Sequence, residues 1–361
     1  MSLFFPGTTS CLVTGGAGFI GCALAPHLLE FFDQVVVLDN LHPQVHPHGR
    51  PPAALPEQVR FIQGDVTDHQ TWDALLAGHH PALVVHLAAE TGTGQSLTAA
   101  HRHAAVNVAG LACMLDGLVR HDKRPQRIVL TSSRAVYGEG AWQAEQGKGI
   151  VYPGQRSAAQ LEQGQWDFPG LDPLPFAAQH TEPHPSSVYG VTKLAQEQLL
   201  TVWGEAMAVE TAILRLQNVY GPGQSLTNPY TGVVSTFAML AAAHKSIPVY
   251  EDGQITRDFV FIDDVVSALC TLIARPTVPR HPLDVGSGQA VTIAEVAARI
   301  ARRYGAPPPH ISGTFRHGDV RHAACVLSPT MAALDWRPQV FLEEGLERFC
   351  RWVDQQRAEG L

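Results

Sequence analysis

The sequence has no Cys-x-x-Cys pair, and its cysteines are scattered at Cys11, Cys22, Cys113, Cys270, Cys325 and Cys350. That spacing indicates neither a zinc site nor a disulfide framework, so we expect no bound metal and a reducing, cytoplasmic compartment. No apolar run reaches the roughly 18 residues that a membrane-spanning helix needs. The N-terminus also lacks a basic segment ahead of an apolar run, so we expect neither a membrane span nor a signal peptide.

Positive charge is also in short supply, because 25 Lys and Arg face 33 Asp and Glu and leave a net charge of −8. This balance argues against nucleic acid or an anionic membrane as a partner. An anionic small molecule would need a local group of arginines instead. The 18 histidines show no metal-ligand spacing. Three of them, His42, His46 and His48, lie in a proline-rich loop, and we expect them to be solvated.

A glycine turn near the N-terminus carries the first functional signal. An apolar run at 11–14 leads directly into Gly15, Gly18 and Gly21, and a helical pattern follows to Leu29. Glycines between a strand and a helix let the backbone approach a pyrophosphate, and the helix N-terminus supplies N–H donors. The alternative is a plain turn between a strand and a helix.

The next two strands extend this pattern. The apolar run 35–38 reads as a buried strand and ends at Asp39, about twenty residues beyond the glycines. An acidic residue there accepts hydrogen bonds from an adenosine ribose and repels a 2′-phosphate, which favours NAD over NADP. A simple turn cap is the alternative. After the strand 59–63, Asp65 is placed to accept from an adenine amine, and Asp68 caps a helix at 69–77.

Two further strands end in polar residues. The strand 82–89 runs into a glycine-rich loop at 90–96, and the strand 127–131 ends near Ser133. Ligands bind at the carboxyl ends of such strands. Between them we expect one long helix from about Thr98 to His121. Asn107 lies in its apolar run and needs a partner, for which a loop backbone near the cofactor would serve.

Residues 139–180 interrupt the alternation of strands and helices. They are rich in Gln, Gly, Pro and Ala and show no periodicity. A loop of this length inside a domain is uncommon and often functional. We interpret it as an insertion near the mouth of the site, either a lid or an elaboration without a role.

Tyr189 and Lys193 form the most telling pair. In a helix from Ser187 to Val202, a spacing of four residues places both side chains on one face. An ammonium beside a phenol favours the phenolate and lowers its pKa, which gives a device for moving a hydroxyl proton. Taken alone, the pair also occurs by chance on helix surfaces.

The remaining pattern alternates strands at 211–216 and 282–285 with helices at 232–243, 263–274, 292–304 and 342–355. It predicts an α/β fold: a Rossmann-type doubly wound parallel sheet with a smaller C-terminal α/β substrate domain. We expect the dinucleotide domain to cover 1–185 with the insertion 139–180, and 211–245 and 260–290 to return partly to it. Residues 186–361 would mainly bind substrate.

In combination, the motifs resemble a known family. The glycine turn 15–21, Ser133, Tyr189-x-x-x-Lys193, the stretch 218–222 (Asn-Val-Tyr-Gly-Pro) and the stretch 257–260 (Arg-Asp-Phe-Val) follow the order of extended short-chain dehydrogenase/reductases. The chain is most similar to their nucleotide-sugar epimerase/dehydratase branch. The resemblance implies an NAD cofactor and a nucleotide-diphosphate sugar as substrate. It also implies a homodimer in which helices 98–121 and 187–203 pair.

The resemblance implies roles for individual residues. The catalytic residues would be Ser133, Tyr189 and Lys193. The cofactor would contact Gly15, Gly18, Phe19, Ile20, Gly21, Asp39, Asn40, Asp65, Val66, Leu87, Ala88, Ala89, Asn107, Tyr189 and Lys193. The substrate would contact Thr91, Ser133, Arg134, Asn218, Tyr250, Arg257 and Arg316. Arginines suit a diphosphate because they provide charge-assisted donors.

One departure from the family narrows the reaction. Dehydratases of the branch carry Asp-Glu after the catalytic serine or threonine, whereas this chain has Arg134 and Ala135. We therefore expect 4-epimerisation or ketone reduction rather than 4,6-dehydration. The stretches 90–96 and 217–230 resemble the subgroup of dTDP-L-rhamnose 4-epimerases, which form dTDP-6-deoxy-L-talose. The alternatives are a UDP-glucose type 4-epimerase, an NAD(P)-dependent 4-ketoreductase and, least favoured, a non-enzymatic NAD-binding subunit.

Overall fold

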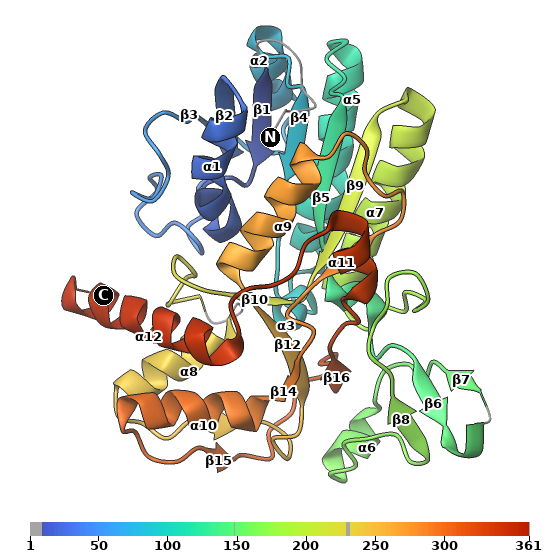
Figure 1. Ribbon diagram of the computed structural model, residues 1–361, viewed down its shortest axis with the longest axis vertical. Helices are drawn as coiled ribbons and strands as arrows, with labels where there is room; N and C mark the ends of the chain where they lie inside the picture. The colour runs from blue at the N-terminus through green and yellow to red at the C-terminus, as the bar shows by residue number, and fades with distance from the viewer. Residues whose placement is uncertain (1–8, 148, 229–231, 361) are drawn as a thin grey trace.

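Seven parallel strands form the largest sheet of the computed structural model, which describes residues 9–147, 149–228 and 232–360. Residues 1–8 and 229–231, which the predicted domain ranges include, lie outside the described residues. The sheet confirms the predicted α/β class with a doubly wound parallel sheet (Figure 1). In spatial order its strands are β13 (Leu283–Val285), β9 (Glu210–Leu216), β5 (Arg127–Ser133), β4 (Leu83–His86), β1 (Ser10–Thr14), β2 (Gln34–Asp39) and β3 (Arg60–Gln63).

Helices cover both faces of this sheet, which explains why its strands read as continuous apolar runs. On β2, Val35 and Val37 pack toward one face and Val36 toward the other, as the two-residue period of a strand requires. The first face packs against α1 (Phe19–Phe31) and α9 (Ile262–Ala274). The second packs against α2 (His69–Gly78), α5 (Gly110–Arg120) and α7 (Val188–Met207).

The order of the strands fixes where a ligand can bind. The chain adds β2 and β3 on one side of β1 and then places β4 on the other side. At such a switch point the connections leave in opposite directions, so a crevice opens at the carboxyl ends of the strands. Here that crevice lies beyond Thr14 of β1 and His86 of β4.

The predicted long helix at about 98–121 is confirmed as a continuous helical segment over residues 100–120, and it contains one irregular turn. The structure has a short helix α3 (Thr93–Ser96), then α4 (Ala100–Ala104), a π-helical turn at Ala105–Ala109, and α5. Asn107 lies in the π turn; its Oδ1 accepts from Glu90 N at 2.8 Å and its Nδ2 donates to Glu90 O at 3.0 Å. The expectation that a loop backbone satisfies this buried amide is confirmed. Widened turns of this kind often occur at functional sites.

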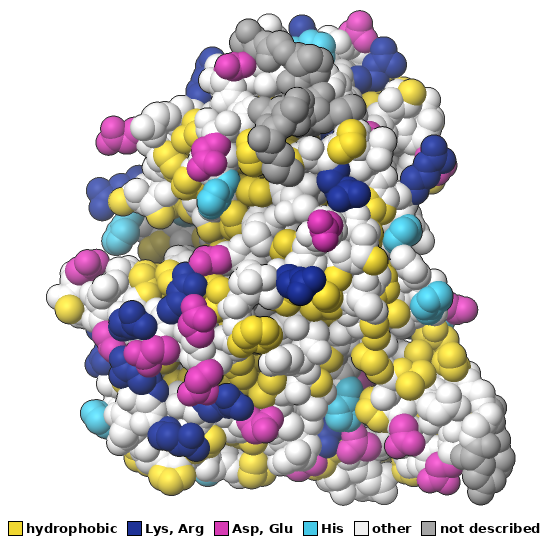
Figure 2. All heavy atoms as spheres, viewed as in Figure 1, with side chains coloured by type: hydrophobic (Ala, Val, Ile, Leu, Met, Phe, Trp, Pro, Cys, Tyr) yellow, Lys and Arg dark blue, Asp and Glu magenta, His cyan; other side chains and the backbone are white. Residues whose placement is uncertain are grey.

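A smaller group of elements lies at the carboxyl edge of the large sheet (Figure 1). Its helices are α8 (Val233–Ala242), α10 (Ile293–Tyr304) and α12 (Leu342–Ala358). Figure 2 shows basic and acidic side chains interspersed over α10 and α12, where Arg299 pairs with Glu343. The strands of this smaller group are β10 (Asn218–Tyr220), β12 (Thr256–Phe261), β14 (Ala290–Thr292), β16 (His322–Ala323), β11 (Pro248–Val249) and β15 (His310–Ile311). The domain boundary near residue 185 stays a prediction.

The insertion, residues 139–180, is not the structureless loop that the sequence suggested. It contains a three-stranded antiparallel sheet in the order β7 (Ile150–Val151), β6 (Trp142–Ala144) and β8 (Leu171–Pro173), and a helix α6 (Ala158–Glu162). Figure 1 shows it projecting from the lower right of the molecule. Strands of two or three residues are too short to show a period, which is why the pattern was missed.

No helix among the described residues is both long enough and apolar enough to span a bilayer.

Candidate functional site

A cavity of about 880 Å³ opens at the carboxyl ends of the parallel strands. It holds most of the residues predicted from the sequence, drawn from segments far apart in the chain. Those that line it are Gly15, Gly18, Phe19, Ile20, Gly21, Asp39, Asn40, Val66, Leu87, Ala88, Ala89, Thr91, Ser133, Arg134, Tyr189 and Asn218. Those outside its lining are Asp65, Asn107, Lys193, Tyr250, Arg257 and Arg316.

The glycine turn is built for close backbone approach. Gly15 has φ +66°, and a Cβ there would lie 2.6 Å from the backbone nitrogen of Ala88. A Cβ on Gly21 would lie 2.4 Å from the carbonyl oxygen of Gly16, so any larger residue would push α1 away from the glycine turn. The first turn of α1 has no side-chain cap at Gly18. Its N–H groups therefore face the cavity as donors for an anionic group, and this arrangement fits a pyrophosphate.

Asp39 is placed to hold a ribose. Its Oδ2 accepts from Ala17 N at 3.1 Å and its Oδ1 accepts from Leu41 N at 2.9 Å. A carboxylate has about four acceptor positions, so one remains on each oxygen for a hydroxyl group. Asp65 is more heavily engaged, because it accepts from Asn40 Nδ2 at 2.9 Å and from Thr67 Oγ1 at 2.7 Å. Its predicted contact with adenine stays a prediction.

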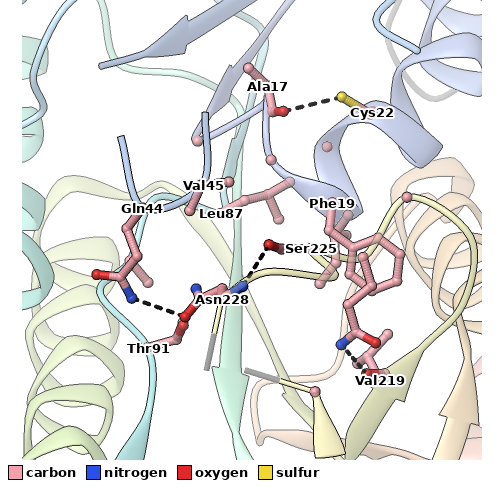
Figure 3. Close-up of a pocket in the computed structure, with 18 of the residues that line it drawn as sticks. Ala17, Phe19, Cys22, Gln44, Val45, Leu87, Thr91, Val219, Ser225 and Asn228 are labelled. Atoms are coloured by element: carbon pink, nitrogen blue, oxygen red, sulfur yellow. Dashed lines mark hydrogen bonds between the residues drawn. The ribbon is translucent and has the colours of Figure 1, made fainter. Parts of the chain in front are cut away.

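The loop at 41–58 folds over this end of the cavity. His46 is only 8% exposed and lies 3.8 Å from Asp39, so the expectation that it is solvated is wrong. Gln44 donates to Asn228 Oδ1 at 3.2 Å across the cavity (Figure 3) and to Gln95 Oε1 at 3.1 Å. These bonds tie the loop to segments on two other sides of the cavity. These contacts could not be predicted from the sequence, because the proline-rich loop shows no periodicity.

The loop and α12 leave a notch between them, visible at the left of Figure 2. Ala53 lines the cavity from the loop, and Trp352 and Gln356 line it from α12. The C-terminal helix thus contributes to the lining of the cavity, a role that no motif in its sequence suggested.

Ser133 and Tyr189 both line the cavity, and their side chains share a hydrogen bond. Ser133 caps the short 3₁₀ turn at Arg134–Tyr137 and accepts from Ala135 N at 3.1 Å, which fixes its hydroxyl. Burial raises the pKa of Tyr189, while its hydrogen bond with Ser133 and the charge of Arg134 oppose that rise. The predicted lowering of this pKa by Lys193 is therefore not observed; the serine and the arginine act on the phenol instead.

Lys193 ends a chain of buried hydrogen bonds. Its Nζ donates to Gln196 Oε1 at 2.5 Å, and Gln196 Nε2 lies 3.3 Å from His86 Nε2. The other ring nitrogen of His86 lies 2.8 Å from Thr14 Oγ1, directly before the glycine turn. Burial lowers the pKa of Lys193 to about 7 and that of His86 to about 3. His86 therefore stays neutral and holds the chain in place rather than carrying a proton.

Positive charge gathers beside Ser133 and Tyr189. Arg134 Nε donates to Asn218 Oδ1 at 2.7 Å, and burial together with the charge of Arg257 lowers the pKa of Arg134 to about 9. Arg257 is buried, and its Nη1 donates to the carbonyl oxygens of Thr256 and Arg321. Neither guanidinium forms an ion pair within the described part of the chain. Two such cations side by side favour an anionic ligand.

Tyr250 and Arg316, both predicted for the substrate, contact each other. The guanidinium carbon of Arg316 lies 5.0 Å from the centre of the Tyr250 ring, and Arg316 Nη2 donates to Tyr250 Oη at 3.3 Å. The structure brings this pair together outside the lining of the cavity.

Sequence reasoning missed several residues of the site. Glu90 pairs with Arg102 at 2.6 Å, and both line the cavity. Gln44 and Gln196 were also missed. Polar residues in a loop or on a helix carry no spacing that marks them, so only contacts between distant segments identify them.

Comparisons with known proteins agree with this geometry. The model of the NAD dependent epimerase/dehydratase family matches residues 11–157 and 168–286. The chain is 56% identical over 345 residues to a dTDP-L-rhamnose 4-epimerase of Burkholderia thailandensis, which covers 96% of this chain and 95% of that protein. It is 29% identical over 338 residues to a UDP-glucose 4-epimerase of Mycolicibacterium smegmatis, over 93% of this chain and 96% of that protein.

Two solved structures also resemble this chain over nearly its whole length. A UDP-glucose 4-epimerase of Thermus thermophilus in complex with NAD has a TM-score of 0.75 and 26% identity, over 96% of this chain and 99% of that one. A UDP-glucose 4-epimerase of Thermotoga maritima with UDP-glucose has a TM-score of 0.77 and 25% identity, over 97% of this chain and 100% of that one.

Proposed function

The chain belongs to the NAD dependent epimerase/dehydratase family, and from that premise we propose that it is a nucleotide-sugar 4-epimerase that interconverts dTDP-L-rhamnose and dTDP-6-deoxy-L-talose. Identity of 56% to a dTDP-L-rhamnose 4-epimerase over nearly the whole chain is the observation that carries the proposal. The 29% identity to a UDP-glucose 4-epimerase fits that alternative less well. The enzyme uses NAD, for which the glycine turn and Asp39 provide a fitting site.

The enclosure of the cofactor end supports an epimerase over a net reductase. An epimerase regenerates its cofactor in every cycle and has no need to exchange it. The bonds that Gln44 makes to Gln95 and Asn228 hold the 41–58 loop across the cavity, and Arg102 reinforces them through Gln44 Oε1 at 3.3 Å. A loop held in this way slows cofactor release, which suits a resident NAD.

The residues at the reacting end account for both half-reactions. Tyr189 takes the proton of the C4 hydroxyl, and Ser133 holds that oxygen by a hydrogen bond. Bound NAD supplies a reversible hydride acceptor for C4, so no external reductant is consumed. After the 4-keto sugar turns over in the site, Tyr189 returns the proton to the C4 oxygen. Arg134 occupies the place where dehydratases need a carboxylic acid, so water is not eliminated.

Substrate conversion tests the proposed function directly. Incubation with dTDP-L-rhamnose is expected to give dTDP-6-deoxy-L-talose, and the reverse reaction is expected from the other sugar. UDP-glucose serves as the competing substrate, and NMR of the products measures all three conversions. Failure to convert any of the nucleotide sugars would reject the epimerase. Steady consumption of NADH with a 4-keto sugar would instead select the ketoreductase.

A second prediction concerns the homodimer that the family resemblance implies. Helix α7 exposes Val191, Leu199 and Val202 to 53%, 39% and 68%. Exposed apolar side chains along one helix are typical of an interface. We expect Val202→Arg to shift the protein from dimer to monomer in light scattering, because a charge would have to be buried. Ile150→Arg, at a residue 62% exposed on the insertion, is the control and should leave the dimer intact. A monomeric wild type would refute the dimer.

All six cysteines are free, which supports the proposal of a reducing, cytoplasmic compartment.

A further inference from the structure

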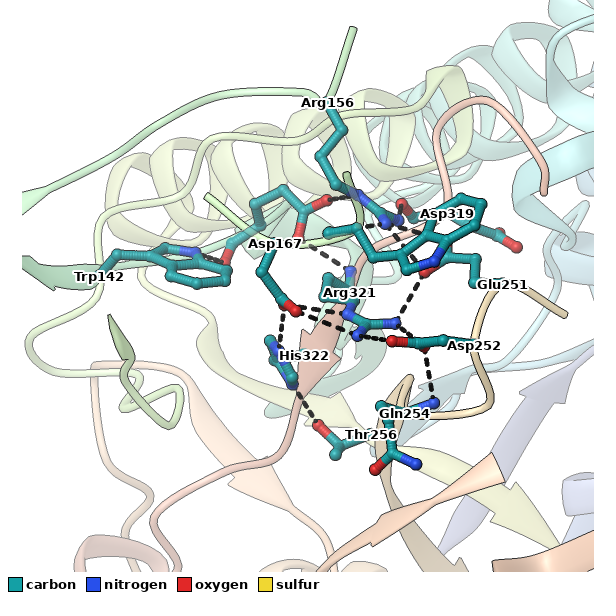
Figure 4. Close-up of polar contacts among 12 residues, drawn as sticks. Trp142, Arg156, Asp167, Glu251, Asp252, Gln254, Thr256, Asp319, Arg321 and His322 are labelled. Atoms are coloured by element: carbon teal, nitrogen blue, oxygen red, sulfur yellow. Dashed lines mark hydrogen bonds and ion pairs between the residues drawn. The ribbon is translucent and has the colours of Figure 1, made fainter. Parts of the chain in front are cut away.

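The insertion is fastened to the substrate side of the molecule by a buried cluster of charges (Figure 4). Arg156 lies in the insertion and is 2% exposed. Its Nε donates to Glu139 Oε1 at 3.0 Å, its Nη1 to Glu251 Oε2 at 3.0 Å, and its Nη2 to the carbonyl oxygen of Asp319 at 2.9 Å. One guanidinium therefore joins the insertion to two separate segments of the substrate side.

Arg321 makes the reciprocal connection from the substrate side. It is 1% exposed, and its guanidinium donates to both carboxylate oxygens of Asp167 at 3.0 and 3.1 Å and to both of Asp252 at 2.7 and 2.9 Å. Its backbone nitrogen donates to Glu139 Oε2 at 2.8 Å. Bidentate pairs to a buried guanidinium have a fixed geometry, because the planar group directs its N–H donors in set directions.

The segments held in this way carry the residues predicted to bind the substrate. Glu251 and Asp252 directly follow Tyr250, and Asp319 lies three residues after Arg316. The carbonyl oxygen of Arg321 accepts from Arg257 Nη1 at 3.3 Å. The ring of Trp166 in the insertion also lies 6.2 Å from that of Phe315, next to Arg316. Tyr250, Arg257 and Arg316 are therefore each next to, or hydrogen-bonded to, a segment that the insertion contacts.

We propose that the insertion is a positioning element which, through Arg156, Asp167 and Arg321, holds Arg257 and the Tyr250–Arg316 pair in place for the nucleoside diphosphate part of the substrate. This inference rests on the proposed function, because it takes the substrate to be a nucleotide-diphosphate sugar. It also replaces the expectation of a lid, since a segment fastened by buried ion pairs does not open in each cycle.

Asp167→Asn tests the inference with little risk to folding. The Asp167 side chain is 51% exposed, and Arg321 keeps Asp252 and Glu251 when it is changed. We expect KM for the nucleotide sugar and the Kd of dTDP, measured by calorimetry, to rise together by about 5- to 20-fold. The value of kcat and the NAD content of the purified protein should stay within about twofold, because neither depends on these arginines. Asp167→Glu should restore part of the affinity.

Asp172→Asn is the matched control. It makes the same chemical change on β8 of the same insertion, at an exposed side chain with no ion pair in the described structure. It should leave both constants unchanged. Equal dTDP affinity in Asp167→Asn and wild type would overturn the inference while leaving the epimerase intact. A wild type that binds no dTDP and converts no nucleotide sugar would overturn both.

Discussion

Tyr189→Phe should lower kcat for the 4-epimerisation by about 10²- to 10⁴-fold, the range that one positioned acid/base group contributes. The phenylalanine ring fills the same space beside Ser133 but cannot take the proton of the C4 hydroxyl. NAD content should be unchanged, because the glycine turn and Asp39 are untouched. The measurement is the rate of dTDP-6-deoxy-L-talose formation, together with the NAD released on denaturation.

Tyr304→Phe is the control for this substitution. Its hydroxyl donates to the carbonyl oxygen of Cys350 at 3.1 Å, between α10 and α12, and it does not line the cavity. Its rate should match that of the wild type within about twofold. If Tyr189→Phe kept near-normal turnover, the phenol would not be the proton acceptor, and the mechanism proposed above would be wrong.

Lys193→Met should weaken NAD binding by about 10- to 100-fold at pH 6.5, as expected when one or two hydrogen bonds from a charged donor are lost. Lys193 is 2% exposed, and methionine fits a buried aliphatic path without adding a polar group. The Kd of NAD for the cofactor-free protein, measured by calorimetry, reports this loss. Lys245→Met changes an exposed lysine and should leave the Kd unaltered.

The pH dependence of NAD binding separates this role from simple packing. Burial lowers the pKa of Lys193 to about 7, and the charge of Glu197 on the same helix opposes that effect. Below pH 7 the ammonium is already formed, so the affinity for NAD should not change with pH. Above pH 7 binding must take up a proton, and the affinity should fall by up to about tenfold per unit. His86 stays neutral over this range.

Lys193→Met should abolish that fall in affinity above pH 7. Gln196→Leu should move it to lower pH, because the ammonium loses the oxygen that it donates to at 2.5 Å and its charged form becomes less favourable. An identical pH dependence in wild type and Lys193→Met would contradict the assignment of Lys193 as a donor to the cofactor.

The sequence by itself determined the fold class, the cofactor and the branch of enzyme. Glycines 15, 18 and 21, an acidic strand end at Asp39, and Tyr189 four residues before Lys193 are local signals, and each of them depends on spacing along one segment. Local spacing can be read from the sequence because, within one strand or helix, it determines which side chains lie on the same face.

Only the tertiary structure decided which side chains contact one another and which of them are buried. Lys193 contacts Gln196 rather than lowering the pKa of Tyr189, and His46 is buried against Asp39. The insertion is fastened through Arg156 and Arg321 to residues about 95 and 154 positions away in the chain. Such contacts join segments with no common period, and buried charges need partners wherever folding supplies them. Their identity is therefore fixed by packing in three dimensions and leaves no pattern along the chain.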